Sequence, residues 1–424
     1  MQTKQKQILV IGGGAAGLTA AAFAAKNGAA VRLLERRERP ARKILVTGKG
    51  RCNLTNNCDL DTLIAHVPRG GRFLYSAFAG FSPADTMALF ESLGVPLKTE
   101  RGNRVFPVSD RAMDIADALA ALAKTSGVRI LQDRAASLLF ENGRAAGAVG
   151  ESGRKYPADA VIVATGGLSY PSTGSTGDGY AFAKAAGHTI QPTVPSLIPL
   201  LSEDPICRAA QGLSLRNVRV EVREAGRKKP VYTDFGELLF THFGLSGPTV
   251  LSASAHLSEP EKKQYTFCID LKPALEESVL DARLLRDFEK NAGRDLCNAL
   301  DGLLPGKLIA PILSRSGVDP HRRVGQVTRE DRQRLISTLK GLAIPISGTR
   351  PVEEAVITRG GVSLKELDPH TMASRLCPGL YFAGEVIDAD GYTGGFNLQI
   401  AFSTGVLAGR SAAESAEEAS PFAG

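Results

Sequence analysis

The stretch 8–35, ILVIGGGAAGLTAAAFAAKNGAAVRLLE, decides the fold of this 424-residue chain. It starts with a short, continuous apolar run, which is typical of a buried parallel strand. A glycine turn and an alanine-rich segment follow, and Asn27-Gly28 is a typical helix end. A second apolar run ends at Glu35. This order predicts a strand, a helix and a second parallel strand, which together form one βαβ unit.

The turn has the spacing Gly12-x-Gly14-x-x-Gly17 between the predicted strand and helix. In a dinucleotide-binding turn, the first glycine permits the tight turn, the second lets the backbone approach a pyrophosphate, and the third lets helix and strand pack closely. The helix N-terminus then presents free N–H groups to the phosphates. Glu35 lies where a carboxylate accepts ribose hydroxyls. The unit therefore predicts a bound dinucleotide, whereas a turn without a ligand would leave Glu35 as an ordinary surface acid.

The α/β pattern continues over residues 1–190 and returns over 350–424. In the first part, the turn pairs Asn142-Gly143 and Ser152-Gly153 separate short apolar runs and predict an antiparallel meander. In the second part, the strand-like run 379–384 is followed by a glycine-rich segment that opens a helix. The two parts are predicted to form one split domain.

Residues 191–349 have a different character and are predicted to form an inserted domain. Its β-rich parts are expected at 191–275 and 344–349, where apolar residues alternate with polar ones, as in antiparallel strands with one solvent-facing side. The stretch 276–343 has a helical period instead.

Two patterns define the helices of this stretch. Thr328 with Asp331 predicts a capping box ahead of an apolar run. Another helix is predicted to bury the stripe of Val279, Leu280, Leu284, Leu285 and Phe288.

Composition and charge indicate a soluble globular protein. Hydrophobic residues make up 43% of the chain and charged residues 22%, with a net charge of +7. The basic residues are scattered, so a solvated surface and sites for anionic cofactor groups are expected rather than a nucleic-acid partner. No apolar stretch is long enough to span a bilayer, and the six cysteines form no CxxC pair. We expect a reduced, cytoplasmic setting without a metal site or a membrane partner.

Several longer motifs make the chain resemble a known family. They are KILVTGKGRCNLTN at 43–56, FGELLFTH at 235–242, GLSGP at 244–248, TRGGV at 358–362, GEVID at 384–388 and GGFNLQ at 394–399. Together they resemble the YhiN/BaiN-like family of bacterial NAD(P)/FAD-dependent oxidoreductases, which includes aminoacetone oxidase-like members. The resemblance covers almost the whole chain.

The resemblance implies a fold class, a cofactor and a type of reaction. The implied fold is α/β, with a split Rossmann-like FAD-binding domain and an inserted β-barrel-like domain that carries a helical subdomain. The implied cofactor is FAD, and the family name implies NAD(P)H as a transient electron donor. Relatives are described as reductases of unsaturated steroid-like acids or as aminoacetone oxidases. We therefore expect hydride transfer between flavin and a small organic substrate, with the direction left open.

The residues expected to contact FAD lie in the glycine turn, the 43–56 motif, several middle segments and the C-terminal motifs. The 43–56 loop supplies N–H groups, cations and amides, although an ordered polar loop without ligand is the alternative. Asp178, in a loop similar to that of fumarate-reductase-type flavoproteins, could also cap a helix. The expected set is Gly12, Gly14, Ala15, Ala16, Gly17, Glu35, Arg36, Lys43, Gly48, Arg51, Cys52, Asn53, Thr55, Ala135, Thr165, Gly166, Gly167, Asp178, Gly384, Glu385, Gly394, Gly395, Phe396, Asn397 and Leu398.

Two features of the C-terminal motifs have specific expected roles. Glu385 occupies the place of the acid that faces the ribityl chain in similar flavoproteins. The helix that begins at 396–399 can stabilise negative charge on the N1–C2 edge of the flavin through its N-terminus.

His242 and Arg359 are the candidate catalytic residues. His242 could deliver a proton as a general acid, or it could be a structural histidine bonded to the backbone. Arg359 lies in a glycine-flanked turn and could hold a substrate carboxylate or the flavin itself. The substrate is expected between the flavin and the inserted domain, because pockets favour domain interfaces. The other five histidines are interpreted as surface or core residues.

Three other functions are weighed against this one. Cys52 and Cys58 have a C-x5-C spacing, whereas flavin disulfide reductases usually have C-x4-C. An FAD-dependent RNA-modifying enzyme would suit the basic pI, but only 227–229 forms a basic cluster in the inserted region. The third alternative is a flavin-binding regulator without turnover. In that case no electron donor would bleach the bound flavin. The sequence indicates no oligomeric state.

Overall fold

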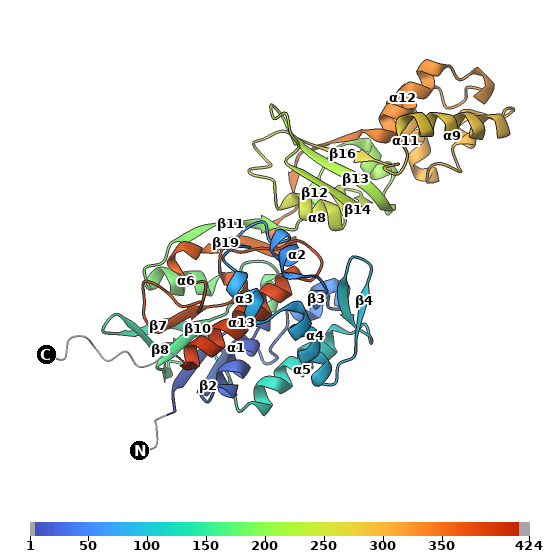
Figure 1. The fold of residues 1–424 in the computed structure, drawn as a ribbon. Coiled ribbons are helices and arrows are strands. Elements are labelled where there is room, and N and C mark those ends of the chain that lie inside the picture. Colours follow the sequence, from blue (N-terminus) through green and yellow to red (C-terminus); the bar gives the residue numbers. More distant parts are fainter. Residues whose placement is uncertain (1–4, 415–424) are drawn as a thin grey trace. The chain divides into compact units, whose positions relative to one another are not determined.

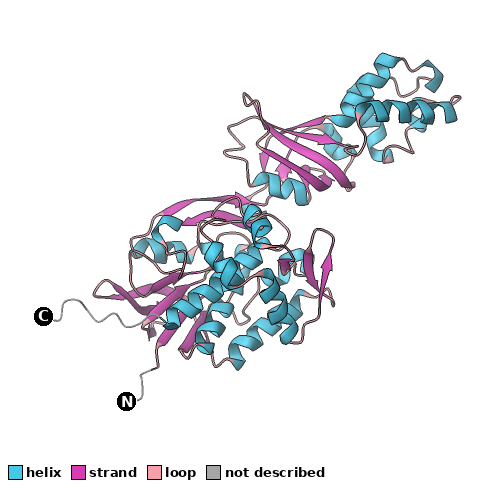
Figure 2. Ribbon diagram, viewed as in Figure 1, coloured by secondary structure: helices cyan, strands magenta, loops and turns pink. Residues whose placement is uncertain are grey.

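The computed structural model describes residues 5–414, which form two compact units with separate apolar cores (Figure 1). One unit combines Met1–Pro195 with Val352–Gly424, and the other is Ser196–Pro351. Both units contain helices and strands (Figure 2). Within the described residues, no helix has both the length and the apolar character needed to cross a membrane.

The first unit is organised around a five-stranded sheet with the order β20-β10-β1-β2-β6. All neighbouring strands in it are parallel. Its strands are β1 (Gln7–Ile11), β2 (Ala30–Glu35), β6 (Arg129–Gln132), β10 (Ala160–Val163) and β20 (Leu380–Phe382). The predicted βαβ unit is confirmed, and a strand from the C-terminal segment completes the sheet beside β10.

Helices α1 (Ala15–Lys26) and α13 (Phe396–Glu414) pack closely against each other (Figure 1). A Cβ atom at Gly405 would lie 2.6 Å from the carbonyl oxygen of Ala16, and one at Gly409 would lie 2.3 Å from that of Ala20. Only glycine permits this approach. The packing joins the first and the last helix of the chain.

The remaining elements of the first unit are short. Its other α-helices are α2 (Leu60–Ala65), α3 (Tyr75–Gly80), α4 (Pro83–Ser92), α5 (Ala112–Thr125) and α6 (Asp178–Ala185). Its 3-10 helices are η1 (Ile44–Gly50), η2 (Pro171–Thr173), η4 (Val352–Glu354), η5 (Leu364–Glu366) and η6 (Gly384–Val386).

Three small sheets accompany the parallel one. The first consists of β3 (Thr55–Asn56), β4 (Leu97–Glu100) and β5 (Arg104–Pro107). The third consists of β11 (Ile190–Ser196) and β19 (Ile357–Val362). The second consists of β7 (Ala135–Glu141), β8 (Arg144–Gly150) and β9 (Lys155–Pro157). The second of these is antiparallel throughout, which confirms the meander predicted from the two turn pairs.

The second unit contains a seven-stranded antiparallel sheet in the order β17-β16-β13-β14-β15-β12-β18. The strands are β12 (Leu200–Leu201), β13 (Ser214–Glu224), β14 (Tyr232–Thr241), β15 (Gly244–Ser246), β16 (Tyr265–Asp270), β17 (Leu342–Ile346) and β18 (Gly348–Thr349). The two edge strands β17 and β18 are separated in sequence only by Ser347. The sheet must therefore curl round on itself, which gives the barrel-like form that the resemblance implies.

Helices accompany this sheet and form the insert within it. They are α7 (Pro205–Ala209), α8 (Pro248–Ser254), α9 (Glu277–Lys290), α10 (Leu296–Ala299), α11 (Gly306–Ser316), η3 (Val324–Gln326) and α12 (Arg329–Lys340). The predicted capping box at the start of α12 is confirmed, because the Thr328 hydroxyl accepts from the Asp331 N–H and the Asp331 carboxylate accepts from the Thr328 N–H.

The predicted apolar stripe of α9 is partly wrong. Leu280, Leu284 and Phe288 are buried, whereas Val279 is 48% and Leu285 is 40% exposed. The buried residues are four apart and follow one face of the helix, and the two exposed residues are each one position off that face. The core contacts a narrower face than the apolar residues of α9 suggest.

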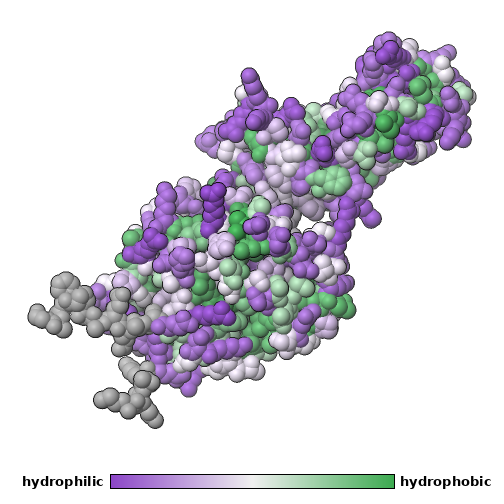
Figure 3. All heavy atoms as spheres, viewed as in Figure 1, coloured by the Kyte–Doolittle hydropathy of each residue, from purple (hydrophilic) through white to green (hydrophobic). Residues whose placement is uncertain are grey.

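Large apolar side chains that reach solvent are scattered over both units rather than gathered in one stretch. They are Val46, Tyr75, Val108, Phe140, Phe235, Val279, Leu285 and Leu376. The face shown in Figure 3 accordingly mixes hydrophilic and hydrophobic residues.

Candidate cofactor site

One cavity in the first unit is lined by residues that follow every strand of its parallel sheet. β1, β2, β6, β10 and β20 lead into cavity residues at 11–16, 34–36, 133–135, 164–166 and 383–385. In open parallel sheets, ligands bind in the crevice outside the carboxyl ends of the strands. The cavity lies where that rule places a nucleotide.

The glycine turn forms one wall, and its three glycines have different surroundings. Gly12 has a φ of +102°, and a Cβ there would lie 2.6 Å from the carbonyl oxygen of Ala164. A Cβ at Gly17 would lie 1.8 Å from the carbonyl oxygen of Gly12, so this glycine lets the helix approach the strand. Around Gly14 there is no atom within 4 Å of a Cβ position. Gly14 lines the cavity, and a side chain there would occupy space that a pyrophosphate can fill.

The N-terminus of α1 offers hydrogen-bond donors to the same space. Gly14 is its N-cap and provides no side-chain cap, and the first turn has no acidic residue. The first helical bond runs from the Leu18 N–H to the Gly14 carbonyl oxygen. The preceding N–H groups, at the positive end of the helix, are therefore suited to an anion.

Glu35 is held in place by backbone donors. Its Oε2 accepts a 2.8 Å hydrogen bond from the Gly13 N–H, and its Oε1 accepts one of 2.8 Å from the Arg37 N–H. Each carboxylate oxygen has a second lone pair, which can accept a hydrogen bond from a ribose hydroxyl.

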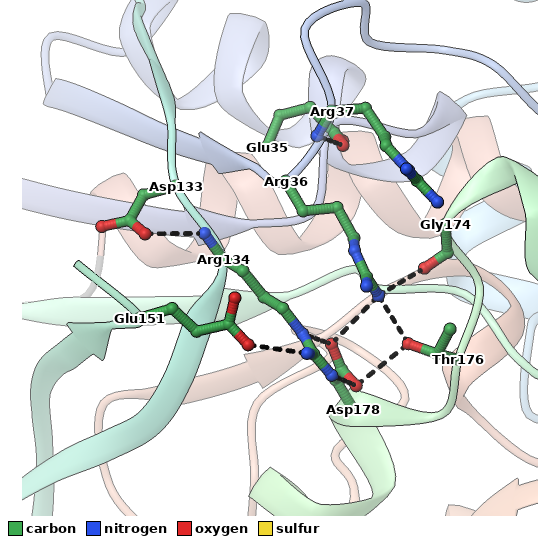
Figure 4. Close-up of polar contacts among 9 residues, drawn as sticks. All are labelled: Glu35, Arg36, Arg37, Asp133, Arg134, Glu151, Gly174, Thr176 and Asp178. Atoms are coloured by element: carbon green, nitrogen blue, oxygen red, sulfur yellow. Dashed lines mark hydrogen bonds and ion pairs between the residues drawn. The ribbon is translucent and has the colours of Figure 1, made fainter.

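Beside Glu35, two arginines share the carboxylate of Asp178 (Figure 4). Arg134 donates to both Asp178 oxygens, at 2.9 and 2.8 Å, and Arg36 lies 3.6 Å from one of them. Arg36 also donates to the Thr176 hydroxyl at 2.6 Å. The hydrogen bonds from Arg134 hold the pKa of Asp178 below its usual range. We call Arg36, Arg134, Thr176 and Asp178 the Asp178 cluster.

A second cluster contains Lys43 and Glu385. Lys43 Nζ lies 2.5 Å from Glu385 Oε2 and 2.5 Å from the Ser169 hydroxyl. Glu385 Oε1 accepts from the Ser169 hydroxyl at 2.7 Å and from the Thr358 N–H at 2.8 Å. This set, which we call the Glu385 cluster, satisfies both carboxylate oxygens and joins three distant segments of the chain.

Segments 53–56 and 391–399 are joined by a network of their own. The Thr55 hydroxyl donates to the buried Gln399 side chain at 2.6 Å, and the Asn56 amide donates to the Gly394 carbonyl at 3.1 Å. A Cβ at Gly395 would lie 2.4 Å from the Thr55 backbone, so only glycine fits there. These contacts hold the start of α13 against a segment about 340 residues earlier in the chain.

Thr165 contributes an unpaired polar group to the cavity wall. Its hydroxyl oxygen is buried and has no hydrogen-bond partner among residues 5–414. Together with the open space at Gly14 and the free N–H groups of α1, it gives the cavity polar groups that fit a phosphate-containing cofactor.

The structure brings most of the predicted cofactor residues to this cavity. Those that line it are Gly12, Gly14, Ala15, Ala16, Glu35, Arg36, Lys43, Ala135, Thr165, Gly166, Asp178, Gly384, Glu385, Asn397 and Leu398. The predicted residues outside its lining are Gly17, Gly48, Arg51, Cys52, Asn53, Thr55, Gly167, Gly394, Gly395 and Phe396. Contact of either group with FAD remains a prediction.

Several of the second group have other contacts. Arg51 pairs with Glu100 and Asp110 and lies over the Phe106 ring, 4.2 Å from its centroid. Cys52 is fully buried, and burial raises the pKa of its thiol to about 12. Because a thiolate is the reactive form, this burial argues against a disulfide reductase.

The sequence analysis did not single out some cavity residues, chiefly Arg39, Arg42, Asp133 and Arg134. Asp133 and Arg134 directly follow β6. The rule that the carboxyl ends of parallel strands meet at one crevice could have indicated them.

The two catalytic candidates lie in different units. His242 is exposed in the turn between β14 and β15 of the second unit, and its ring packs edge-on against Phe243, with ring centroids 5.0 Å apart. Arg359 lies on β19 of the first unit and is partly buried. Its positive charge acts on Asp388, whose pKa is nevertheless raised by burial. Their catalytic roles remain predictions.

The chain is similar to known proteins over almost its whole length. Residues 6–411 match the model of the HI0933-like protein Rossmann domain. The chain is 34% identical over 415 residues to a 3-dehydro-bile acid delta(4,6)-reductase of Clostridium scindens, covering 96% of this chain and 99% of that protein. It is 32% identical over 396 residues to the ribosomal RNA dihydrouridine synthase of Escherichia coli, covering 93% and 95%.

Among solved structures, the fold is similar to that of 3-ketosteroid-delta4-(5alpha)-dehydrogenase from Rhodococcus jostii, with a TM-score of 0.53. The two sequences are 16% identical, and the match covers 98% of this chain and 99% of the dehydrogenase chain. At this identity the likeness shows the fold alone. It agrees with the predicted α/β fold with a split FAD-binding domain, and the matching family confirms the predicted resemblance. The chain belongs to the HI0933-like family and is an FAD-dependent oxidoreductase with a Rossmann domain.

Proposed function

We propose that this protein reduces a carbon–carbon double bond that is conjugated to a carbonyl group. The names of the similar proteins support this direction. A delta(4,6)-reductase of a 3-dehydro-bile acid removes double bonds next to a ring ketone, and a dihydrouridine synthase saturates the ring double bond next to a uracil carbonyl. In a reduction of this kind a hydride would reach the carbon that the carbonyl makes electrophilic, and a proton would reach its neighbour.

The main support for the proposal is the cavity that residues from the N-terminal and C-terminal segments line together. The N-terminal glycine turn and the C-terminal residues Glu385, Asn397 and Leu398 line the same space. We propose that the turn, the α1 N-terminus and Glu35 hold the pyrophosphate and ribose of FAD. The start of α13 would then meet the flavin end. FAD, when bound, supplies the hydride.

The chain's own groups would orient the cofactor and its charge. The start of α13 directs its positive end at the cavity, which favours negative charge at the flavin edge. The Asn397 amide exchanges two 2.8 Å hydrogen bonds with the Gly391 backbone, which rigidifies the turn before the helix. Lys43 adds a cation that Glu385 holds in position.

His242 and Arg359 are proposed to serve the substrate. His242 would deliver the proton as a general acid. Arg359 would bind a carboxylate of the substrate through its planar guanidinium. If His242 has this role, its replacement by Ala lowers turnover and removes the corresponding limb of the pH profile. Unchanged turnover with an unchanged profile would exclude it.

The experiment for the main proposal is anaerobic and uses the full-length protein. Its absorbance spectrum first shows whether oxidised flavin is bound. NADH, NADPH and amines are then tested for bleaching of that flavin. We expect a nicotinamide to bleach it and 2-cyclohexen-1-one, a minimal enone, to restore the absorbance. Bleaching by an amine followed by recovery with oxygen alone would instead indicate an amine oxidase, and a protein that takes up no flavin would refute both.

A second candidate function is the reduction of uridine in RNA. Besides the dihydrouridine synthase relatives, one feature of the second unit favours it. Arg219 on β13 pairs in register with the exposed Phe235 on β14, which places a cation beside an aromatic ring on the solvent-facing side of the sheet. Such pairs bind single-stranded bases by stacking. Salt-dependent retention of ribosomal RNA, lost in Arg219→Gln with Phe235→Ala, would support it.

A further inference from the structure

The cations of the cavity differ in whether a carboxylate already neutralises them. Arg36 and Arg134 pair with Asp178, and Lys43 pairs with Glu385. Arg39 pairs with Asp117 at 2.7 Å. The remaining cation in the lining is Arg42, and no carboxylate or other polar group of the described chain pairs with its side chain. A pyrophosphate that enters the cavity therefore meets one cation with no competing anion.

The backbone places Arg42 beside the glycine turn. The N–H of the preceding residue, Ala41, donates a 2.8 Å hydrogen bond to the carbonyl oxygen of Gly13. Ala41 is buried, and its carbonyl oxygen accepts from the Ile44 N–H at 3.0 Å as η1 begins. These two hydrogen bonds fix the backbone of the residue next to Arg42. Arg42 therefore directly follows a residue that contacts the turn that we propose to hold the pyrophosphate.

The backbone at Ala41 is also strained. Its φ of +61° lies in the left-handed region, which is unfavourable for a residue with a Cβ. Strain of this kind persists where the surrounding structure enforces it, and it is common at ligand-binding sites. Ala41 itself and the next residue, Arg42, both line the cavity.

We propose that Arg42 is the residue that pairs with the pyrophosphate of the cofactor. The proposal rests on the proposed binding of FAD by the glycine turn. An arginine suits this role because its planar guanidinium donates paired hydrogen bonds to phosphate oxygens. The charge balance of the cavity gives the reason for Arg42 in particular, since each neighbouring cation already has an anionic partner.

ADP and adenosine are the probes that test it, because only ADP carries the diphosphate. The full-length protein, freed of flavin, is titrated with FAD in the presence of each compound, and flavin fluorescence reports competition. For the native sequence we expect ADP to compete more strongly than adenosine. In Arg42→Gln we expect the affinity for ADP to fall about 10- to 100-fold while that for adenosine changes less than about threefold.

Matched variants separate this role from a general loss of charge. Lys124→Gln removes one positive charge from an exposed residue of α5, outside the cavity lining and outside the 43–56 loop, and we expect its ADP affinity to stay within about twofold of the native value. Arg42→Lys keeps the charge but lacks the planar guanidinium, so it should recover part of the lost ADP affinity. Circular dichroism shows whether each variant is folded.

Three results would overturn the role of Arg42. One is an equal loss of ADP affinity in Arg42→Gln and Lys124→Gln. Another is an equal loss for adenosine and ADP in Arg42→Gln, and the third is native protein that does not distinguish the two compounds. Native protein that binds neither FAD nor ADP would refute the proposed cofactor site itself, which is a different outcome.

Discussion

The Asp178 cluster and the Glu385 cluster line the same cavity but are built differently. In the first, one carboxylate is shared by two arginines and a hydroxyl, and Asp178 is 19% exposed. In the second, Glu385 is only 10% and Lys43 24% exposed, and no second cation between residues 5 and 414 pairs with Glu385. The comparison shows two ways of placing charge at a cofactor site: a carboxylate shared by two cations, and a more buried carboxylate that pairs with one cation and two neutral donors.

The physical consequence lies in what remains when one member is lost. Removing a carboxylate from a buried pair leaves a desolvated cation without a counter-ion, which is costly. In the Asp178 cluster the other partners of the two arginines, and water at these more exposed side chains, can replace part of the lost interaction. The Glu385 cluster should therefore be the more sensitive of the two.

The largest effect is expected for Glu385→Gln. It leaves Lys43 without a counter-ion and with only the Ser169 hydroxyl as a partner. We expect a loss of about 2–3 kcal/mol in the free energy of unfolding, below the range for fully buried pairs because Lys43 is partly exposed. Urea denaturation of the flavin-free protein measures it. The double variant with Lys43→Met should recover part of the loss, and equal losses in the single and double variants would show that the ion pair is not the cause.

A smaller effect is expected for Asp178→Asn. Arg134 keeps its 2.6 Å contact with Glu151, and Arg36 keeps Thr176, so both cations retain a partner. We expect a loss of about 1–2 kcal/mol in the same denaturation experiment. A loss greater than that of Glu385→Gln would reverse the comparison.

The contribution of Asp178 to the free energy of unfolding should depend on pH. Its pKa is lowered in the folded protein, so its contribution to stability is complete above its ordinary pKa of about 3.9 and is lost as the pH falls through the lowered value. The difference in unfolding free energy between native protein and Asp178→Asn should be constant near neutral pH and shrink in strongly acidic buffer. A difference that grows on acidification would contradict the assignment.

The smallest effect is expected for Asp117→Asn, which removes the partner of another cavity cation. Arg39 is 43% and Asp117 64% exposed, as is typical of surface pairs. We expect a change below about 0.5 kcal/mol, measured by the same denaturation. A loss comparable to that of Asp178→Asn would mean that exposure does not rank the three pairs.

Local patterns predicted the elements that bound the cavity. Gly12, Gly14 and Gly17 have the surroundings that the spacing predicts, because a tight turn and a close helix depend only on neighbouring residues. The capping box at Thr328 was predicted for the same reason. The α9 stripe shows the limit, because Val279 and Leu285 are apolar but the core does not reach them.

The partners of the charged residues could not be predicted in this way. Asp178 is 44 residues from Arg134, and Glu385 is 342 residues from Lys43. The ion pairs of Arg51 with Glu100 and Asp110 were likewise not predicted, and its contact with the cofactor stays a prediction. No local periodicity relates such residues, so their contacts appear only when distant segments pack.

The sequence by itself therefore predicted the βαβ unit and the dinucleotide turn, because each depends on backbone conformation over a short stretch. The split domain was predicted from the return of the α/β pattern after residue 350, and the type of cofactor from the family resemblance. Only the tertiary structure decided which cations are neutralised and which one, Arg42, is left for an anion. Charge pairing acts through space between segments, and its outcome depends on distance and burial, which a linear pattern does not contain.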